Sequence, residues 1–135
     1  MSCNDNNKIV FQTSRFGSLE VDAEKIITFP DGILGFPAIK RYVLLDHKET
    51  VLKWLHAVDD PDVAFIVIEP RIMLPKFNMT LDPTTKRFLQ LDSEDDLVTF
   101  VIIRVEKEQV IANFHGPLLF NAALRLGVQV VLDKL

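Results

Sequence analysis

Short runs of β-branched and aromatic residues recur along the whole chain. Many of them alternate apolar and polar side chains, the period-two pattern of a strand with one buried face, and others are continuously apolar. The pattern predicts strands at residues 8–13, 18–21, 26–29, 41–45, 52–58, 64–68, 97–105, 109–114 and 129–132. The chain is therefore expected to be mainly β.

Turn-forming residues separate these runs at short and fairly regular spacing. They include Gly17, the Pro30-Asp31-Gly32 triplet, the acidic segment 59–62 and the polar segment 106–108. Pro, Gly and Asp favour turns because they fix or widen the accessible φ range or bond to their own backbone. Segment 106–108 is expected to join a hairpin. Closely spaced turns favour antiparallel neighbours.

Two segments carry helical signals instead. Asp82 followed by Pro83 is the combination of an N-cap and a first helical residue, so a short helix is predicted to run to Leu89. A second helical turn is predicted at residues 121–126, closed by Gly127. The predicted fold is mainly β: a small compact β-barrel-like domain of short, largely antiparallel strands with one or two short helices, since closure removes exposed strand edges.

The most informative stretch is the loop that follows the run at residues 26–29. After the turn at Pro30 it places Ile33, Leu34 and Phe36 among glycines, where an ordinary surface turn would be polar. Apolar residues in a loop either enter the core or form a contact surface for a partner. We expect Phe29 and Phe36 to lie in the core, and Ile33 or Leu34 to lie nearer the surface.

Composition narrows the function. The 135 residues are 48% hydrophobic, enough for one core, and carry a formal net charge of -4 with a pI near 5.3. A negatively charged domain gains little binding free energy from the phosphate backbone of nucleic acid, so no direct nucleic-acid ligand is expected. The single Cys3 cannot form an internal disulfide, and neither a signal peptide nor a membrane-spanning run is expected. These features indicate a cytoplasmic protein.

The candidate chemistry is sparse. His47, His56 and His115 show no metal-ligand spacing; His56 is expected to be a partly buried, hydrogen-bonded imidazole and His115 to cap a strand end. The acids 59, 60 and 62 could bind a hard cation, but a solvated turn is favoured. No phosphate-binding or nucleophile motif is present. We therefore expect no enzyme, no cofactor and no metal.

Two alternatives remain open at this stage. The first is a small-ligand-binding β-barrel, in which Trp54, His56 and His115 point into a cavity. The second, a hydrolase using the acids of segment 59–62, is remote because paired acids need a cleft and a base. The acidic segment is also expected to form a charged rim that sets the register of a protein partner.

Three blocks of sequence, residues 26–36, 54–65 and 112–121, resemble the FliW family of flagellar assembly factors and occur in the family's order. Residues 15–17 and 127–132 extend the resemblance over most of the chain. The sequence departs from the family at His56, where Gln is more frequent. The resemblance implies a single FliW-like domain over residues 1–135, with residues 1–7 flexible, and a compact β-barrel-like fold.

The same resemblance implies a function by partner exchange. In that family, flagellin occupies the factor in the cytoplasm before export, and the freed factor binds the translational regulator CsrA and lifts its repression of flagellin synthesis. A protein acting in this way is neither an enzyme nor a nucleic-acid or membrane binder. The candidate partner-binding residues are Phe29, Pro30, Ile33, Leu34, Phe36, Asp59, Asp60, Asp62, Asn113 and Phe114.

Overall fold

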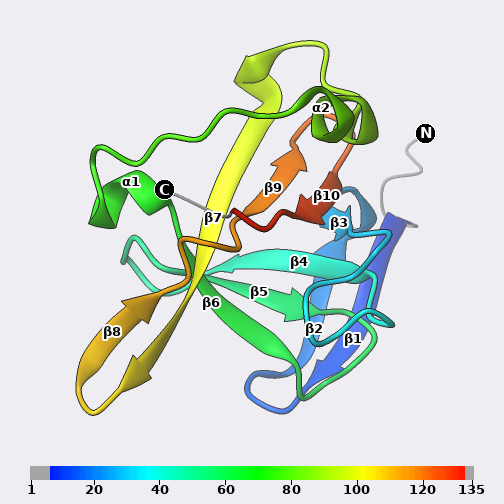
Figure 1. The fold of residues 1–135 in the computed structure, drawn as a ribbon. Coiled ribbons are helices and arrows are strands. Elements are labelled where there is room, and N and C mark those ends of the chain that lie inside the picture. The colour runs from blue at the N-terminus through cyan, green and yellow to red at the C-terminus, as the bar shows by residue number, and fades with distance from the viewer. Residues whose placement is uncertain (1–6, 133–135) are drawn as a thin grey trace.

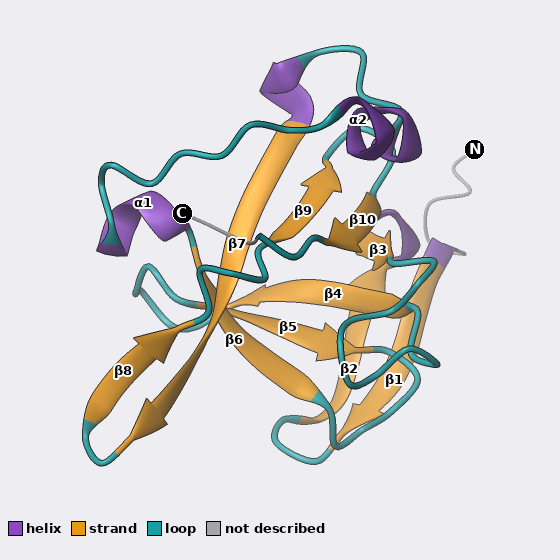
Figure 2. Ribbon diagram, in the orientation of Figure 1, coloured by secondary structure: helices purple, strands orange, loops and turns teal. Residues whose placement is uncertain are grey.

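The computed structural model describes residues 7–132. Cys3 lies outside this range, as does the segment expected to be flexible apart from Asn7. The described part contains the strands β1 (Lys8–Thr13), β2 (Gly17–Asp22), β3 (Ile26–Thr28), β4 (Arg41–Asp46), β5 (Lys53–Ala57), β6 (Ala64–Ile68), β7 (Leu97–Glu106), β8 (Gln109–Ala112), β9 (Leu118–Asn121) and β10 (Leu126–Gln129). The α-helices are α1 (Pro70–Met73) and α2 (Pro83–Leu89), and Figure 2 shows how far strands outweigh helices.

Seven strands close into a barrel. Their order is β6-β5-β4-β3-β10-β9-β7, and β7 returns to pair with β6. Every neighbouring pair is antiparallel except β3 and β10, which are parallel and meet at Leu126 and Thr28. The far half of β7 leaves the barrel and pairs with β8, so that these strands form a projecting hairpin (Figure 1). The prediction of a mainly β, barrel-like fold is confirmed.

The hairpin of β1 and β2 forms a separate small sheet against the barrel. Strand β3 contributes to two hydrophobic clusters. Ile27 packs with Tyr42 inside the barrel. Its neighbour Ile26 packs with Val43 and Phe11 between the barrel and the hairpin. Successive side chains of a strand point to opposite faces. Continuously apolar strands are therefore needed wherever the hairpin covers the barrel.

The predicted helix is confirmed as α2. The Asp82 carboxylate accepts a hydrogen bond from the Thr85 amide at 2.7 Å, and Gln90 ends the helix with a left-handed φ of 54°. The buried Asn121 side chain in β9 donates to the Leu89 carbonyl at 2.8 Å. Because a buried amide without a partner is costly, this bond holds α2 against the barrel. The short helix α1 was not predicted.

A turn is present at residues 121–126 as predicted, but Gly127 does not close it. The chain makes one turn there, with the Arg125 amide donating to the Asn121 carbonyl at 2.6 Å, and Arg125 takes the left-handed φ of 55°. Gly127 lies inside β10 instead. A Cβ there would lie 2.7 Å from the Phe29 ring, so this glycine is required by packing rather than by a turn.

Two strands at the C-terminal end were predicted poorly. Strand β10 begins three residues before the predicted segment 129–132, and β9 was missed. All four residues of β9 are buried, so it has no alternating pattern. The hairpin turn expected at residues 106–108 is confirmed between β7 and β8, where Lys107 and Glu108 have positive φ values of 49° and 66°.

We predict that Gly127→Ala destabilises the fold by about 1 to 3 kcal/mol, since an added methyl group must displace the buried Phe29 ring. Chemical denaturation measures the loss. Equal stabilities of Gly127→Ala and the wild type would show that Phe29 does not pack against β10 in this way.

Candidate partner-binding surface

The loop at residues 29–40 divides its apolar side chains between core and surface. Phe29 is 1% exposed and Ile33 2%, whereas Leu34 is 65% and Phe36 36% exposed. The expectation is thus confirmed for Phe29 and Leu34 and wrong for Phe36, which lies at the surface while Ile33 lies in the core. A tight turn from Ile33 to Phe36, closed by a 2.6 Å amide-to-carbonyl bond, points Ile33 inward.

The backbone of this loop is well ordered by its own hydrogen bonds. The Gly32 amide donates to the Phe29 carbonyl at 2.8 Å, and the Lys40 ammonium donates to the Pro30 carbonyl at 2.8 Å. Gly32 has a φ of 70°, and a Cβ there would lie 2.5 Å from the Phe36 carbonyl oxygen. Only glycine fits this position. The loop therefore presents Leu34 on a fixed backbone.

Gln129 joins the loop to the segment before β9. Its side-chain oxygen accepts a hydrogen bond from the Leu34 amide at 2.8 Å, and its side-chain nitrogen donates to the Gly116 carbonyl at 2.9 Å. Candidate residue Asn113 is exposed, and Phe114 is half-buried with its ring 5.9 Å from that of Phe77. The first and third sequence blocks thus meet through a residue that sequence reasoning missed.

The second block meets the loop through aromatic contacts. The Phe36 ring packs edge-on against Phe65 at 5.5 Å, and Phe65 lies 6.2 Å from the buried Tyr42 ring. The Tyr42 hydroxyl has no hydrogen-bond partner among the described residues. Burial, with a smaller contribution from Asp60, raises the pKa of Tyr42 to about 12. The hydroxyl consequently stays protonated at neutral pH.

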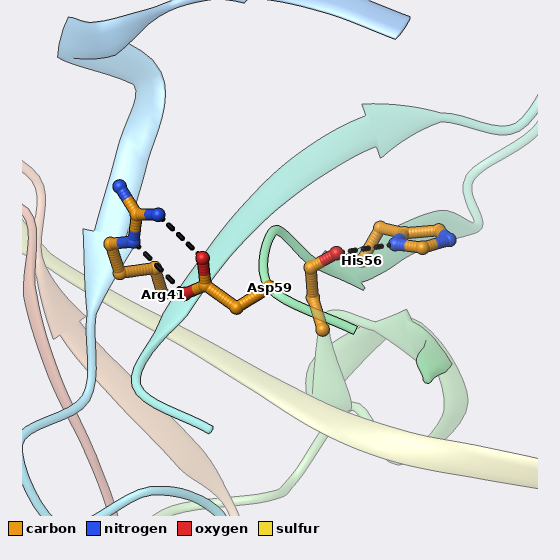
Figure 3. Close-up of polar contacts among 4 residues, drawn as sticks. Arg41, His56 and Asp59 are labelled. Carbon is orange, nitrogen blue, oxygen red and sulfur yellow. Dashed lines mark hydrogen bonds and ion pairs between the residues drawn. The ribbon is translucent and has the colours of Figure 1, made fainter. Parts of the chain in front are cut away.

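The acidic turn after β5 is tied to the fold. Arg41 donates from Nε to Asp59 at 3.0 Å and from a terminal nitrogen at 2.5 Å, a two-bond ion pair (Figure 3). The Asp60 carboxylate accepts from the Asp62 amide at 3.0 Å, and the Asp62 carboxylate accepts from the Ser14 hydroxyl. The expectation of a solvated turn is confirmed, since Asp59 and Asp62 are exposed, and each carboxylate has in addition a partner within the fold.

The ion pair shifts the pKa of both side chains. The hydrogen bond from Arg41 is the largest cause that lowers the pKa of Asp59, opposed by partial desolvation. The same bond raises the pKa of Arg41. The pair is about half exposed on both side chains, so solvent screens it and its contribution to stability is small. Its main effect is to fix the turn on β4.

Each histidine has its own hydrogen-bond partner. His56 is 1% exposed, and its Nδ1 is bonded to the Ala57 carbonyl at 2.8 Å (Figure 3). The Trp54 indole donates to His47 Nδ1 at 2.9 Å, and His115 is exposed near the Leu132 carbonyl. Trp54, His56 and His115 therefore do not converge on a cavity as the ligand-binding alternative requires. Within residues 7–132, no group of histidine and acidic side chains could hold a metal ion.

The fold and its surface are those of a small β-barrel that presents an ordered apolar loop. No helix in the described range is long and apolar enough to cross a membrane. The family model described as FliW protein matches residues 9–135. The chain therefore belongs to the FliW family of flagellar assembly factors, which are not enzymes.

Relatives and a solved structure agree with this assignment. The chain is 34% identical to the flagellar assembly factor FliW of Caldanaerobacter subterraneus subsp. tengcongensis, with 90% of this chain and 84% of the relative covered. It is 37% identical to that of Syntrophus aciditrophicus, over 90% and 78% of the two chains. The crystal structure of a flagellar assembly factor FliW superposes with a TM-score of 0.87 at 33% identity, covering 94% of this chain and 91% of that one.

We predict that Ile33→Ala costs about 2 to 5 kcal/mol of unfolding free energy, the usual loss for a buried aliphatic side chain. Leu34→Ala in the same loop is the matched variant and should change stability by no more than about 0.5 kcal/mol, because Leu34 is exposed. Urea denaturation of both variants measures the two changes in unfolding free energy. A larger loss for Leu34→Ala would reverse the assignment of core and surface in the loop.

We predict that Asp59→Asn lowers stability by less than about 1 kcal/mol near neutral pH, because it removes a half-exposed ion pair. The pKa of Asp59 is lowered in the fold from its ordinary 3.8, so the stabilisation is complete above that value. It is lost as the pH falls through the lowered pKa. Urea midpoints of variant and wild type should therefore converge in acid, whereas a pH-independent gap would exclude ionisation as the cause. Asp31→Asn, in an exposed turn, is the control.

Proposed function

We propose that this chain is a cytoplasmic protein-binding switch that holds flagellin and, when free of flagellin, binds CsrA and so relieves repression of flagellin synthesis. Family membership supports the setting, flagellar assembly, and the sequence resemblance suggests the two partners. The single observation that carries a protein-binding role is the exposure of two apolar side chains, Leu34 at 65% and Phe36 at 36%, on one loop whose backbone is fixed by internal hydrogen bonds. Neighbouring exposed apolar side chains on an ordered loop favour association with another protein surface.

The charge of the chain favours protein over RNA as the direct ligand. A formal net charge of -4 gives no counterion-release gain with phosphate. A negative domain bound to an RNA-binding protein also disfavours RNA nearby, through the summed field of its carboxylates. The chain can thus oppose an RNA binder without contacting RNA. Binding to protein partners works by mass action and needs no chemical step.

The proposed contact surface is centred on the loop at residues 29–40. Leu34 and Phe36 supply the exposed apolar area, and Asn113 lies on the segment that Gln129 joins to the loop. Phe29 and Ile33 are buried, so their part is to hold the loop in place. The acidic residues 59, 60 and 62 are engaged internally and act mainly through long-range steering, which affects association rates.

A switch of this kind requires that the two partners exclude each other. A standard interface takes roughly 800 Å² from each partner, a large share of one face on a domain of this size. Overlapping footprints would therefore produce exclusion directly. Linkage would produce it indirectly, with each partner weakening the other by the same factor.

We predict that flagellin titrated into a preformed complex with CsrA releases CsrA, and that CsrA releases flagellin in the reverse titration. Size-exclusion chromatography with light scattering follows the species present. A stable complex of all three chains at undiminished affinities would contradict the switch.

The contact surface is tested in the same titrations with Leu34→Lys. The Kd for at least one partner should rise about tenfold or more, since an interface anchor contributes more than about 1 kcal/mol to binding. Leu124→Lys is the matched control, as Leu124 is 51% exposed on the turn before β10. Unchanged binding of both partners by Leu34→Lys would exclude the loop as the contact surface.

A further inference from the structure

The tip of the loop at residues 29–40 is hydrogen-bonded to the rest of the fold by one side chain. The Leu34 amide donates to the Gln129 side-chain oxygen at 2.8 Å. Among the described residues, this is the one hydrogen bond that joins residues 30–39 to a part of the chain outside the loop, because their other hydrogen bonds stay within it. The position of Leu34 therefore depends on a residue 95 positions away in the sequence.

The Gln129 side chain uses both functions of its carboxamide at this place. Its oxygen accepts from the Leu34 amide, while its nitrogen donates to the Gly116 carbonyl at 2.9 Å. A backbone amide can only donate and a carbonyl can only accept, so these two partners fix which way the carboxamide points. A carboxylate would lack the donor, and an ammonium or guanidinium group would lack the acceptor.

The surroundings of the carboxamide hold it in this orientation. Gln129 is half-buried on β10, and Gly116 is buried beside it. A Cβ at Gly116 would lie 2.9 Å from the Gln129 side-chain nitrogen, so the glycine leaves the space that the carboxamide occupies. The bond to Gly116 thus fixes the side chain that in turn fixes Leu34.

We propose that Gln129 is a positioning residue of the partner-binding surface, which holds Leu34 in the place where a partner meets it. The inference rests on the proposed function and adds to it a residue that acts through Leu34. A loop that is already held in one conformation binds more tightly, because it loses less conformational freedom on association. Affinity for a partner therefore depends on the Gln129 oxygen as well as on the exposed apolar side chains.

Loss of this bond should loosen the loop without unfolding the barrel. Ile33, the neighbour of Leu34, is 2% exposed and stays packed in the core cluster with Phe29 and Tyr42. Local opening of a surface segment needs less free energy than unfolding of the whole domain. The bond lies near the surface, where a hydrogen bond makes only a modest net contribution. Its effect should therefore appear at the Leu34 amide and in partner binding.

Hydrogen exchange in the free protein, measured by NMR, tests the positioning itself with two matched variants. Gln129→Met and Gln129→Glu both lose the bond to Gly116, so a general loss of stability affects them alike, but only Gln129→Glu keeps an acceptor for Leu34. The Leu34 amide should exchange about tenfold or more faster in Gln129→Met than in Gln129→Glu. The Gly32 amide, which donates to Phe29 within the loop, is the internal control. Equal exchange of the Leu34 amide in both variants would overturn the inference.

Titrations of the same variants with CsrA and with flagellin extend the test to binding. For at least one partner, the Kd of Gln129→Met should exceed that of Gln129→Glu about threefold or more, which is the effect of one modest hydrogen bond. Gln109→Glu, on the exposed start of β8, is the control for the added charge. If Leu34→Lys weakens binding but the two Gln129 variants bind alike, the proposed function stands and the role of Gln129 is refuted. A wild type that binds neither partner would instead refute the proposed function, and the inference with it.

Discussion

The barrel depends on the short parallel junction of β3 and β10. The two strands share one register pair, and the Thr28 amide donates to the Arg125 carbonyl at 2.9 Å. Strength at this junction comes from packing, since the Phe29 ring covers Gly127, where no side chain would fit. The junction joins the half of the barrel made of strands β3, β4, β5 and β6 to the half made of β7, β9 and β10. Among the strands of residues 7–132, the pairing of β6 with β7 is the only other link between these halves. A barrel with two such junctions opens if either fails.

The same junction holds the exposed loop in place. The loop leaves the core at Phe29, whose amide donates to the Lys40 carbonyl at 2.7 Å, and returns directly to β4. Ile33 enters the core midway, and Gln129 of β10 holds the Leu34 amide from the other side. Exposure of Leu34 therefore results from a fixed geometry. A partner that binds this loop loses little free energy to ordering it.

Local pattern predicted most of the fold, and long-range packing decided what it missed. Strands β1 and β6 lie at the predicted residues, and α2 begins at its predicted cap. Gly127 was read as the end of a turn because its neighbour in space, Phe29, is distant in sequence. Ile33 and Phe36 exchanged their expected places because the turn between them sets which one points inward. Neither fact is encoded in local periodicity.

The candidate surface was only partly predictable for the same reason. Gln129 bonds to the loop across 95 positions of sequence, and Arg41 pairs with Asp59 from another strand. Arg41 compensates the charge of Asp59 and Ser14 donates to Asp62, so both carboxylates are already partly engaged within the fold. Charge then acts through the net field of the domain, which influences how fast partners meet. In the proposed complexes, apolar contact at the loop would supply most of the affinity, because the loop is already held in place by its own hydrogen bonds.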